Sequence, residues 1–292
     1  MGFTLSMIPF IPWAVYPVAL ELGFWRDEGL DMEISLHATE EGYCDSLETR
    51  AADFYPLPIS SIFELAVKGE FFVVPSFFDL ANGHKKILVK RDRLGALQGE
   101  TFLCYSDEFS TRYFLAKYLE TVGLTLHDVA IQFCDPQEMA FLFKEGEMAG
   151  CLIFAASVSD LEERTGSATV FSTADYTEPF TAAVPKERWT LELKAALPGF
   201  VRGREKAAAW IEENPDGFYG VVRRWMGDEV SGLSEKEVMA AYGQLKVPSA
   251  HVLSELNGEL FSRLTRFKGS CLRHGIVNEG ELASLDLREL MP

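Results

Sequence analysis

Short apolar segments alternate with amphipathic ones through the first 190 residues, and this alternation predicts strands followed by helices. In the first part of the chain, Val18, Ala19, Leu22 and Trp25 fall on one face of a predicted helix that Gly29 ends. The pattern predicts strands over 3–8, 32–36, 71–76 and 86–90, with helices over 15–28 and 60–68.

The same pattern restarts near residue 101. It predicts strands over 101–105, 130–134, 151–155 and 169–173, with helices over 110–122, 136–144 and 157–164. In the helix over 110–122, Phe114, Leu115, Tyr118, Leu119 and Val122 are expected to face inward. Alternating strands and helices of this kind predict an α/β sheet flanked by helices.

The hydrophobic pattern changes at Leu191, and from there onward it predicts helices only. Helices are predicted over 205–213, 215–226, 234–245 and 251–274. Pro215 suits a first helical turn, and Ser234 with Glu237 forms a capping box. The C-terminal part is therefore expected to be all-helical.

The chain has 292 residues, which fits two lobes rather than one core. Its formal net charge of −17 excludes a general attraction for nucleic acid or anionic lipid. The apolar stretches are too short for a membrane span, and no basic segment precedes an apolar one at the start. Two interpretations remain open: a cytoplasmic protein, or an exported periplasmic or cell-surface protein whose leader was removed.

Neither the cysteine spacing nor any catalytic motif in the sequence indicates a metal site or an active site. The five cysteines, Cys44, Cys104, Cys134, Cys151 and Cys271, include no C-x-x-C pair, so we expect no metal site and no cofactor. The sequence also lacks the phosphate-binding loop G-x-x-x-x-G-K-[ST], G-x-S-x-G and H-E-x-x-H. No catalytic residue is assigned.

A family resemblance is carried by order and spacing. Glu21-Leu22-Gly23-Phe24-Trp25 and Glu28-Gly29-Leu30-Asp31 resemble the opening of type II periplasmic-type substrate-binding proteins of ABC transporters. The chain is most similar to the group that serves alkanesulfonates, nitrate and thiamine pyrimidine precursors. Pro58-Ile59-Ser60-Ser61 and Glu213-Asn214-Pro215 match the same group further along, in the expected order.

The resemblance implies an α/β, two-lobed periplasmic-binding-protein-like (type II) fold with a ligand cleft between the lobes and a helical C-terminal part. Lobe 1 is expected to hold residues 1–90 and 185–292, and lobe 2 residues 91–184. The chain would cross between them near residues 89–90 and 183–184. Strand carboxyl ends and helix amino ends would converge on the ligand.

Candidate ligand-binding residues of lobe 1 follow its strands. Trp13 and Tyr16 are expected to stack on a flat ligand and to offer N–H or O–H groups, unless they pack between helix and sheet. His37 follows the second strand as a pocket donor or as a structural hydrogen-bonding residue. The resemblance places Ser60 and Ser61 at the ligand, while the sequence alone makes them helix N-cap residues.

The remaining candidates come from both lobes. Asp79, at the end of a lobe 1 strand, is expected to pair with a ligand amine. In lobe 2, Tyr105, Phe109, Ser110 and Thr111 join a strand to a helix, whose free amides would bind an anion or a carbonyl oxygen.

These residues predict a protein that binds a small organic molecule by closure about a hinge and delivers it to an ABC-type permease. The expected cleft is rich in aromatic residues and poor in Lys and Arg. We therefore expect a flat heterocycle, such as a thiamine-related pyrimidine, rather than nitrate or a simple sulfonate. The alternative is a cofactor-biosynthesis enzyme, in the menaquinone or thiamine pathway, on the same scaffold. Free cysteines favour that alternative, and the absence of an identifiable acid–base pair disfavours it.

Overall fold

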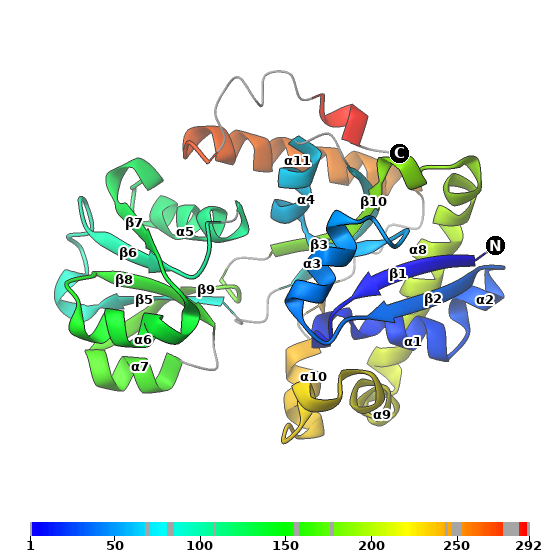
Figure 1. Cartoon of the computed structure of the whole chain (residues 1–292), viewed down its shortest axis with the longest axis horizontal. Coiled ribbons are helices and arrows are strands. Elements are labelled where there is room, and N and C mark those ends of the chain that lie inside the picture. Colours follow the sequence, from blue (N-terminus) through cyan, green and yellow to red (C-terminus); the bar gives the residue numbers. More distant parts are fainter. Residues whose placement is uncertain are drawn as a thin grey trace. The chain divides into compact units, whose positions relative to one another are not determined.

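The chain folds into two compact units (Figure 1). Unit 1 comprises Met1–Asn82, Pro179–Ser262 and Asp286–Pro292, and unit 2 comprises Gly83–Glu178 and Arg263–Leu285. The structure, a computed structural model, describes residues 2–67, 71–80, 85–107, 109–154, 158–175, 178–242, 245–246, 253–276 and 286–290.

Unit 1 begins with two parallel strands, β1 Gly2–Met7 and β2 Asp31–Leu36, paired from Gly2 with Asp31 to Met7 with Leu36. The 3₁₀ helix η1 Ile11–Ala14, α1 Val15–Glu21 and α2 Phe24–Asp27 connect them. The single helix predicted over 15–28 was wrong, because Gly23 adopts a left-handed backbone with φ of 75° and separates α1 from α2.

A second sheet of unit 1 brings together segments from distant parts of the sequence. Its strand order is β11-β4-β10-β3, and β10 pairs antiparallel with β3 through Ala183 and Tyr55. The strands are β3 Tyr55–Pro58, β4 Phe71–Leu80, β10 Glu178–Pro185 and β11 Leu245–Lys246. Leu245 was predicted to end a helix and instead begins β11.

Helices cover these strands, and the longest, α8, packs against α1 and α2. Thr190 caps it by accepting a hydrogen bond from the Leu193 amide, so it starts well before the predicted residue 205 and continues through Pro198. Gly203 of α8 allows close approach to α2, since a Cβ at this position would lie 2.2 Å from Cδ1 of Trp25. The helices are α3 Glu40–Glu48, α4 Ile59–Val67, α8 Leu191–Glu213, α9 Pro215–Met226 and α10 Glu235–Tyr242, with η5 Lys186–Arg188, η6 Gly227–Val230 and η7 Leu287–Leu290.

Unit 2 contains a five-stranded sheet in the order β7-β6-β8-β5-β9. Its strands are β5 Lys85–Lys90, β6 Thr101–Cys104, β7 Ala130–Phe133, β8 Gly150–Phe154 and β9 Ser167–Ser172. The boundary predicted at residue 90 assigns β5 to lobe 1, whereas its antiparallel pairing with β8 and β9 places it in unit 2.

The helices of unit 2 include α11 Leu253–Arg273, whose residues from Arg263 onward belong to this unit although the prediction assigned them to lobe 1. The others are α5 Phe109–Thr121, α6 Pro136–Glu145 and α7 Val158–Thr165, with η2 Arg91–Arg93 and η3 Leu126–Asp128.

The core of unit 2 forms where α6 and α7 cover the sheet, and it includes Cys151, Phe143 and Leu161. Four of the predicted inward residues of α5 are buried. Val122 is not: it is 47% exposed because α5 ends at Thr121, before it.

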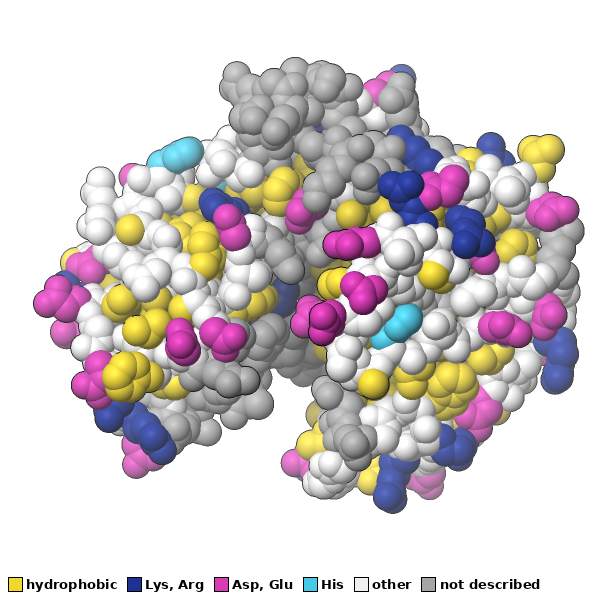
Figure 2. All heavy atoms as spheres, in the orientation of Figure 1, with side chains coloured by type: hydrophobic (Ala, Val, Ile, Leu, Met, Phe, Trp, Pro, Cys, Tyr) yellow, Lys and Arg dark blue, Asp and Glu magenta, His cyan; other side chains and the backbone are white. Residues whose placement is uncertain are grey.

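Acidic side chains are spread over the face of the molecule drawn in Figure 2, as the net charge of −17 leads one to expect. Among the helices that the structure describes, none is both long enough and apolar enough to cross a membrane.

Candidate functional site

The segment that leaves β1 carries the main aromatic candidate of unit 1. Pro12 lies in the first turn of η1, and the Trp13 amide donates to the Phe10 carbonyl at 2.8 Å. The Trp13 ring lies 5.4 Å from Phe10, 5.8 Å from Tyr43 and 6.5 Å from Phe180, measured between ring centroids. We call Phe10, Trp13, Tyr43 and Phe180 the Trp13 cluster.

Trp13 is only 4% exposed, as the packing interpretation requires. Its indole Nε1 is buried and has no hydrogen-bond acceptor among the residues that the structure describes. A buried N–H group without an acceptor costs free energy that a hydrogen-bonded partner would recover. The Trp13 side chain thus combines a packed ring with a buried N–H donor that has no acceptor among the described residues.

Tyr16 packs in the core, which is the alternative to stacking on a ligand that the sequence left open. It is 0% exposed, and its ring stacks with Trp25 at 6.3 Å and with Phe200 at 6.2 Å. Phe200 stacks in turn on Phe54 at 4.2 Å. Burial raises the pKa of the Tyr16 hydroxyl to about 12, although the positive charge of Arg204 opposes the rise. Tyr16 is therefore a neutral core residue.

His37 follows β2 and takes part in a chain of polar contacts beside the Trp13 cluster. Its Nε2 lies 2.8 Å from Oγ of Ser6, which is 3.0 Å from Oγ of Ser46. The ring also lies 6.2 Å from that of Tyr43, whose hydroxyl donates to the Pro56 carbonyl at 2.8 Å. The structure thus brings His37 and Trp13 together around Tyr43.

Sequence reasoning missed Tyr43 and Ser6. Thr39 caps α3 by accepting from the Gly42 amide, and this cap fixes the start of the helix that presents Tyr43. Ser6 is fully buried in β1, and a polar residue that is buried in a strand needs a hydrogen-bond partner.

Ser60 and Ser61 follow the start of α4 and do not precede it. The helix begins at Ile59, so Ser60 and Ser61 lie within its first turn, and the N-cap interpretation was wrong. Ser60 is 1% exposed and Ser61 is half-buried. Asp79 lies on β4 opposite Lys246 of β11, and its side chain lies outside the described residues.

The candidates of unit 2 gather where β6 leads into α5. Oγ1 of Thr111 lies 2.8 Å from Oγ of Ser106, and Thr111 is fully buried. Ser110 is also buried, at 5% exposed. Tyr105 packs against the core of unit 2, and Phe109, the first residue of α5, is half-buried. The hydroxyl of Thr111 is thus engaged within its own unit.

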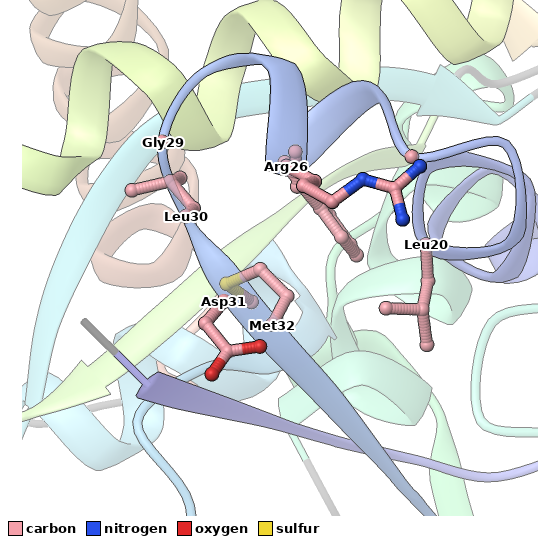
Figure 3. A pocket seen from close by; sticks show the side chains of 8 residues that line it. Leu20, Arg26, Gly29, Leu30, Asp31 and Met32 are labelled. Atoms are coloured by element: carbon pink, nitrogen blue, oxygen red, sulfur yellow. The ribbon is translucent and has the colours of Figure 1, made fainter.

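A pocket of about 440 Å³ lies beside α2 and β2 (Figure 3). Leu20, Arg26 and Met32 line it, together with Asp31 at the start of β2. None of the predicted ligand-binding residues lines this pocket. Within the part of the chain that is described, no group of three His, Cys, Asp or Glu side chains is placed to hold a metal ion.

No model of a known protein family matches the chain, and no curated protein matches it. Solved structures do match. The periplasmic aliphatic sulphonate binding protein SsuA from Escherichia coli is 13% identical with a TM-score of 0.66, over 99% of this chain and 91% of that one. A Candida albicans gene product with the generic periplasmic binding protein fold is 10% identical with a TM-score of 0.66, over 97% and 95%.

A third match is the zinc-bound ligand-binding component of an ABC-type import system from Staphylococcus aureus. It is 12% identical with a TM-score of 0.63, over 95% of this chain and 93% of that one. The chain has the periplasmic binding protein fold, with a helical C-terminal part, which confirms the fold class predicted from the sequence.

Proposed function

We propose that the protein is the ligand-binding component of an ABC-type import system and that its ligand is a flat heterocycle, such as a thiamine-related pyrimidine. The observation that carries the proposal is the buried Trp13 Nε1, which has no acceptor among the described residues although aromatic rings surround it. A heterocycle with a ring nitrogen or carbonyl would supply that acceptor and would pack against the rings.

The fold supports the general role, and the site supports the ligand class. Similar structures are named for an aliphatic sulphonate, zinc and nitrate, so likeness of fold does not select among ligands. The Trp13 cluster and the Ser6–His37 pair contain no Lys or Arg. A sulfonate or nitrate would require charge-assisted hydrogen bonds that these residues do not offer.

An enzymatic use of the Ser6–His37 pair is disfavoured by burial. The two side chains lie within hydrogen-bond distance, as in a nucleophile and its base. Ser6 is nevertheless 0% exposed, and its hydroxyl also contacts Ser46. The pair therefore supports positioning of the His37 ring beside Tyr43 rather than attack on a substrate.

Replacing Trp13 by phenylalanine tests the proposal. Trp13→Phe keeps an aromatic ring and removes the open N–H, so calorimetry should show an aminopyrimidine bound about fivefold to tenfold more weakly than by the wild type. Trp225→Phe is the matched control, because its Nε1 donates to Glu21 at 3.1 Å on the surface of unit 1. This control should bind like the wild type.

Two results would contradict the proposal. If the wild type did not bind any aminopyrimidine but bound an alkanesulfonate, the proposed ligand class would be wrong while the general role survived. If mass spectrometry of the natively purified protein found no retained small molecule and turnover of a cofactor precursor were detected, the enzymatic alternative would replace transport.

A further inference from the structure

We infer that unit 2 contains a second ligand site, specific for a soluble phosphomonoester, in a pocket between α5 and α11. The pocket has a volume of about 540 Å³. Residues one turn apart on α5 form one wall, and residues on one face of α11 form the other. We call it the α5–α11 pocket; it is lined by Tyr113 and Lys117 of α5 and by Thr265, Arg266, Gly269, Ser270 and Arg273 of α11.

The charge of this lining is unusual for the chain. Lys117, Arg266 and Arg273 line the pocket, and no Asp or Glu is among its lining residues. The whole chain carries 44 acidic residues against 27 Lys and Arg. A pocket lined by three cations in such an acidic protein concentrates a local positive potential, and an anion is the ligand that complements it.

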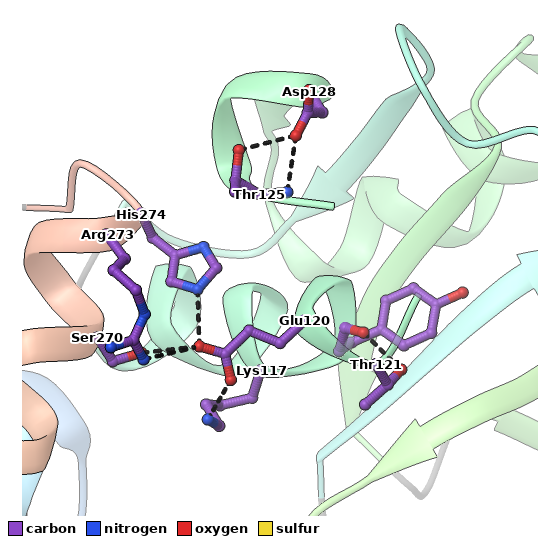
Figure 4. Close-up of polar contacts among 9 residues, drawn as sticks. Lys117, Glu120, Thr121, Thr125, Asp128, Ser270, Arg273 and His274 are labelled. Atoms are coloured by element: carbon purple, nitrogen blue, oxygen red, sulfur yellow. Dashed lines mark hydrogen bonds and ion pairs between the residues drawn. The ribbon is translucent and has the colours of Figure 1, made fainter. Parts of the chain in front are cut away.

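One carboxylate, Glu120 of α5, stands next to the pocket and orients two of its cations (Figure 4). It forms an ion pair with Lys117, and its Oε1 accepts from Nη2 of Arg273 at 3.3 Å and from Oγ of Ser270 at 3.3 Å. His274 contacts the same oxygen at 2.9 Å. This carboxylate therefore holds the side chains of Lys117 and Arg273 in place at the pocket.

Arg273 retains donors for a ligand. Its side chain is 65% exposed, and the contact with Glu120 uses one of the five N–H groups that a guanidinium offers. Guanidinium groups bind phosphate through paired hydrogen bonds, and Lys adds a compact positive charge. The hydroxyl side chains of Thr265 and Ser270 also line the pocket.

The size of the pocket favours a phosphate that carries an organic group. About 540 Å³ far exceeds the space that a bare ion needs. The Tyr113 ring, whose centroid lies 4.2 Å from that of Phe267, gives the pocket an aromatic surface against which an organic group would pack. The net charge of −17 opposes approach to nucleic acid or to an anionic membrane, so the ligand is a small soluble molecule.

Calorimetry with phenyl phosphate and inorganic phosphate at low ionic strength tests the site. We expect saturable binding of both, tighter for phenyl phosphate, and none of phenol. Arg266→Gln leaves the contacts of Glu120 intact and should weaken phenyl phosphate binding roughly tenfold or more, as should Arg273→Gln. Arg91→Gln removes the same charge from an exposed position of unit 2 outside the pocket and should change little.

Trp13→Phe separates this site from the proposed heterocycle site, because it should leave phenyl phosphate affinity unchanged. Several results would overturn the inference. They are the absence of saturable binding by the folded wild type, equal weakening by Arg91→Gln, and weakening by Trp13→Phe. Binding only to vesicles that contain phosphatidic acid would likewise replace the soluble ligand by a lipid headgroup.

Discussion

The segment after β1 in unit 1 and the segment after β6 in unit 2 differ in how they use their polar groups. Both join a strand to a helical segment, and both were predicted to bind ligand. After β1, Trp13 keeps a buried N–H with no acceptor among the described residues. After β6, Thr111 pairs with Ser106, and Arg112 pairs with Asp107.

This difference separates hydrogen bonds that stabilise the fold from a buried donor that has no acceptor among the described residues. A polar group paired within its own unit stabilises that unit, and its removal should appear in thermal stability. A buried donor without a partner costs free energy of folding, so its removal should not lower stability through a lost hydrogen bond and should appear in ligand affinity.

The largest loss of stability should come from replacing a ring in the aromatic stack around Phe200. Phe200 is fully buried and stacks with Phe54, Trp25 and Tyr16. Phe200→Ala should lower the free energy of unfolding by about 3–5 kcal/mol, because it leaves a cavity among the rings. Leu191→Ala, on the same helix but 83% exposed, is the control and should cost little. Equal losses in denaturant titrations would mean that the stack does not hold unit 1 together.

Thr111 should give the next largest effect. Thr111→Ala removes a buried hydroxyl and leaves that of Ser106 without this partner, so unfolding should become easier by about 1–3 kcal/mol. Thr111→Ser keeps the hydroxyl and should recover most of the loss in thermal melting. If Thr111→Ala melted like the wild type but lost ligand affinity, the hydroxyl would belong to the ligand site, and the contrast with Trp13 would disappear.

Ionisation of Glu120 should make the stability of the protein depend on pH in the acidic range. Partial burial raises its pKa, but hydrogen bonds from Lys117 and His274 outweigh this and lower it from 4.5 to about 2. A carboxylate with a lowered folded-state pKa stabilises the fold above pH 4.5, and this contribution is lost as the pH falls toward 2.

Glu120→Gln should therefore flatten the dependence of melting temperature on pH in that range. Its effect at pH 7 should be under about 1 kcal/mol, because the ion pairs are partly exposed to water. Glu145→Gln is the control, since the side chain of Glu145 is 55% exposed on α6. A Glu120→Gln profile parallel to that of the wild type would show that the contacts with α11 do not stabilise unit 2.

The smallest change in stability should come from Trp13→Phe. The variant removes a donor that has no acceptor among the described residues, and the ring that packs on Tyr43 is retained in part. Its apo melting temperature should stay close to that of the wild type, with a loss below about 1.5 kcal/mol from the smaller ring. A loss as large as that of Phe200→Ala would make Trp13 a core residue alone and would remove the contrast between the two segments.

The sequence predicted the ends of helices and strands correctly where those ends depend on contacts between residues close together in the chain. Pro215 starts α9, and the capping box pairs the Glu237 carboxylate with the Ser234 amide at 2.8 Å. Strands β2 and β6 follow their apolar runs closely. The start of α8 was missed because Pro198 discourages a helix, although Thr190 supplies the cap.

Of the candidate site, the sequence identified Trp13, His37 and Thr111 as polar or aromatic residues just after strands. It did not indicate that Tyr43 joins the first two, or that Tyr16 belongs to a stack with Phe200. Residues 16 and 200 are brought together only when α8 packs on α1, and no local pattern reports such a contact.

By itself, the sequence determined the periodicity of the strands and helices, most helix ends and the α/β class, because these depend on side-chain spacing and on caps within a few residues. Only the tertiary structure decided that β5 joins unit 2, that β10 pairs with β3, and that the Trp13 ring is buried with an open N–H. It also brought Lys117 and Arg273 to one carboxylate. Each of these facts depends on which distant surfaces pack together, and the free energy of that packing is shared among many side chains.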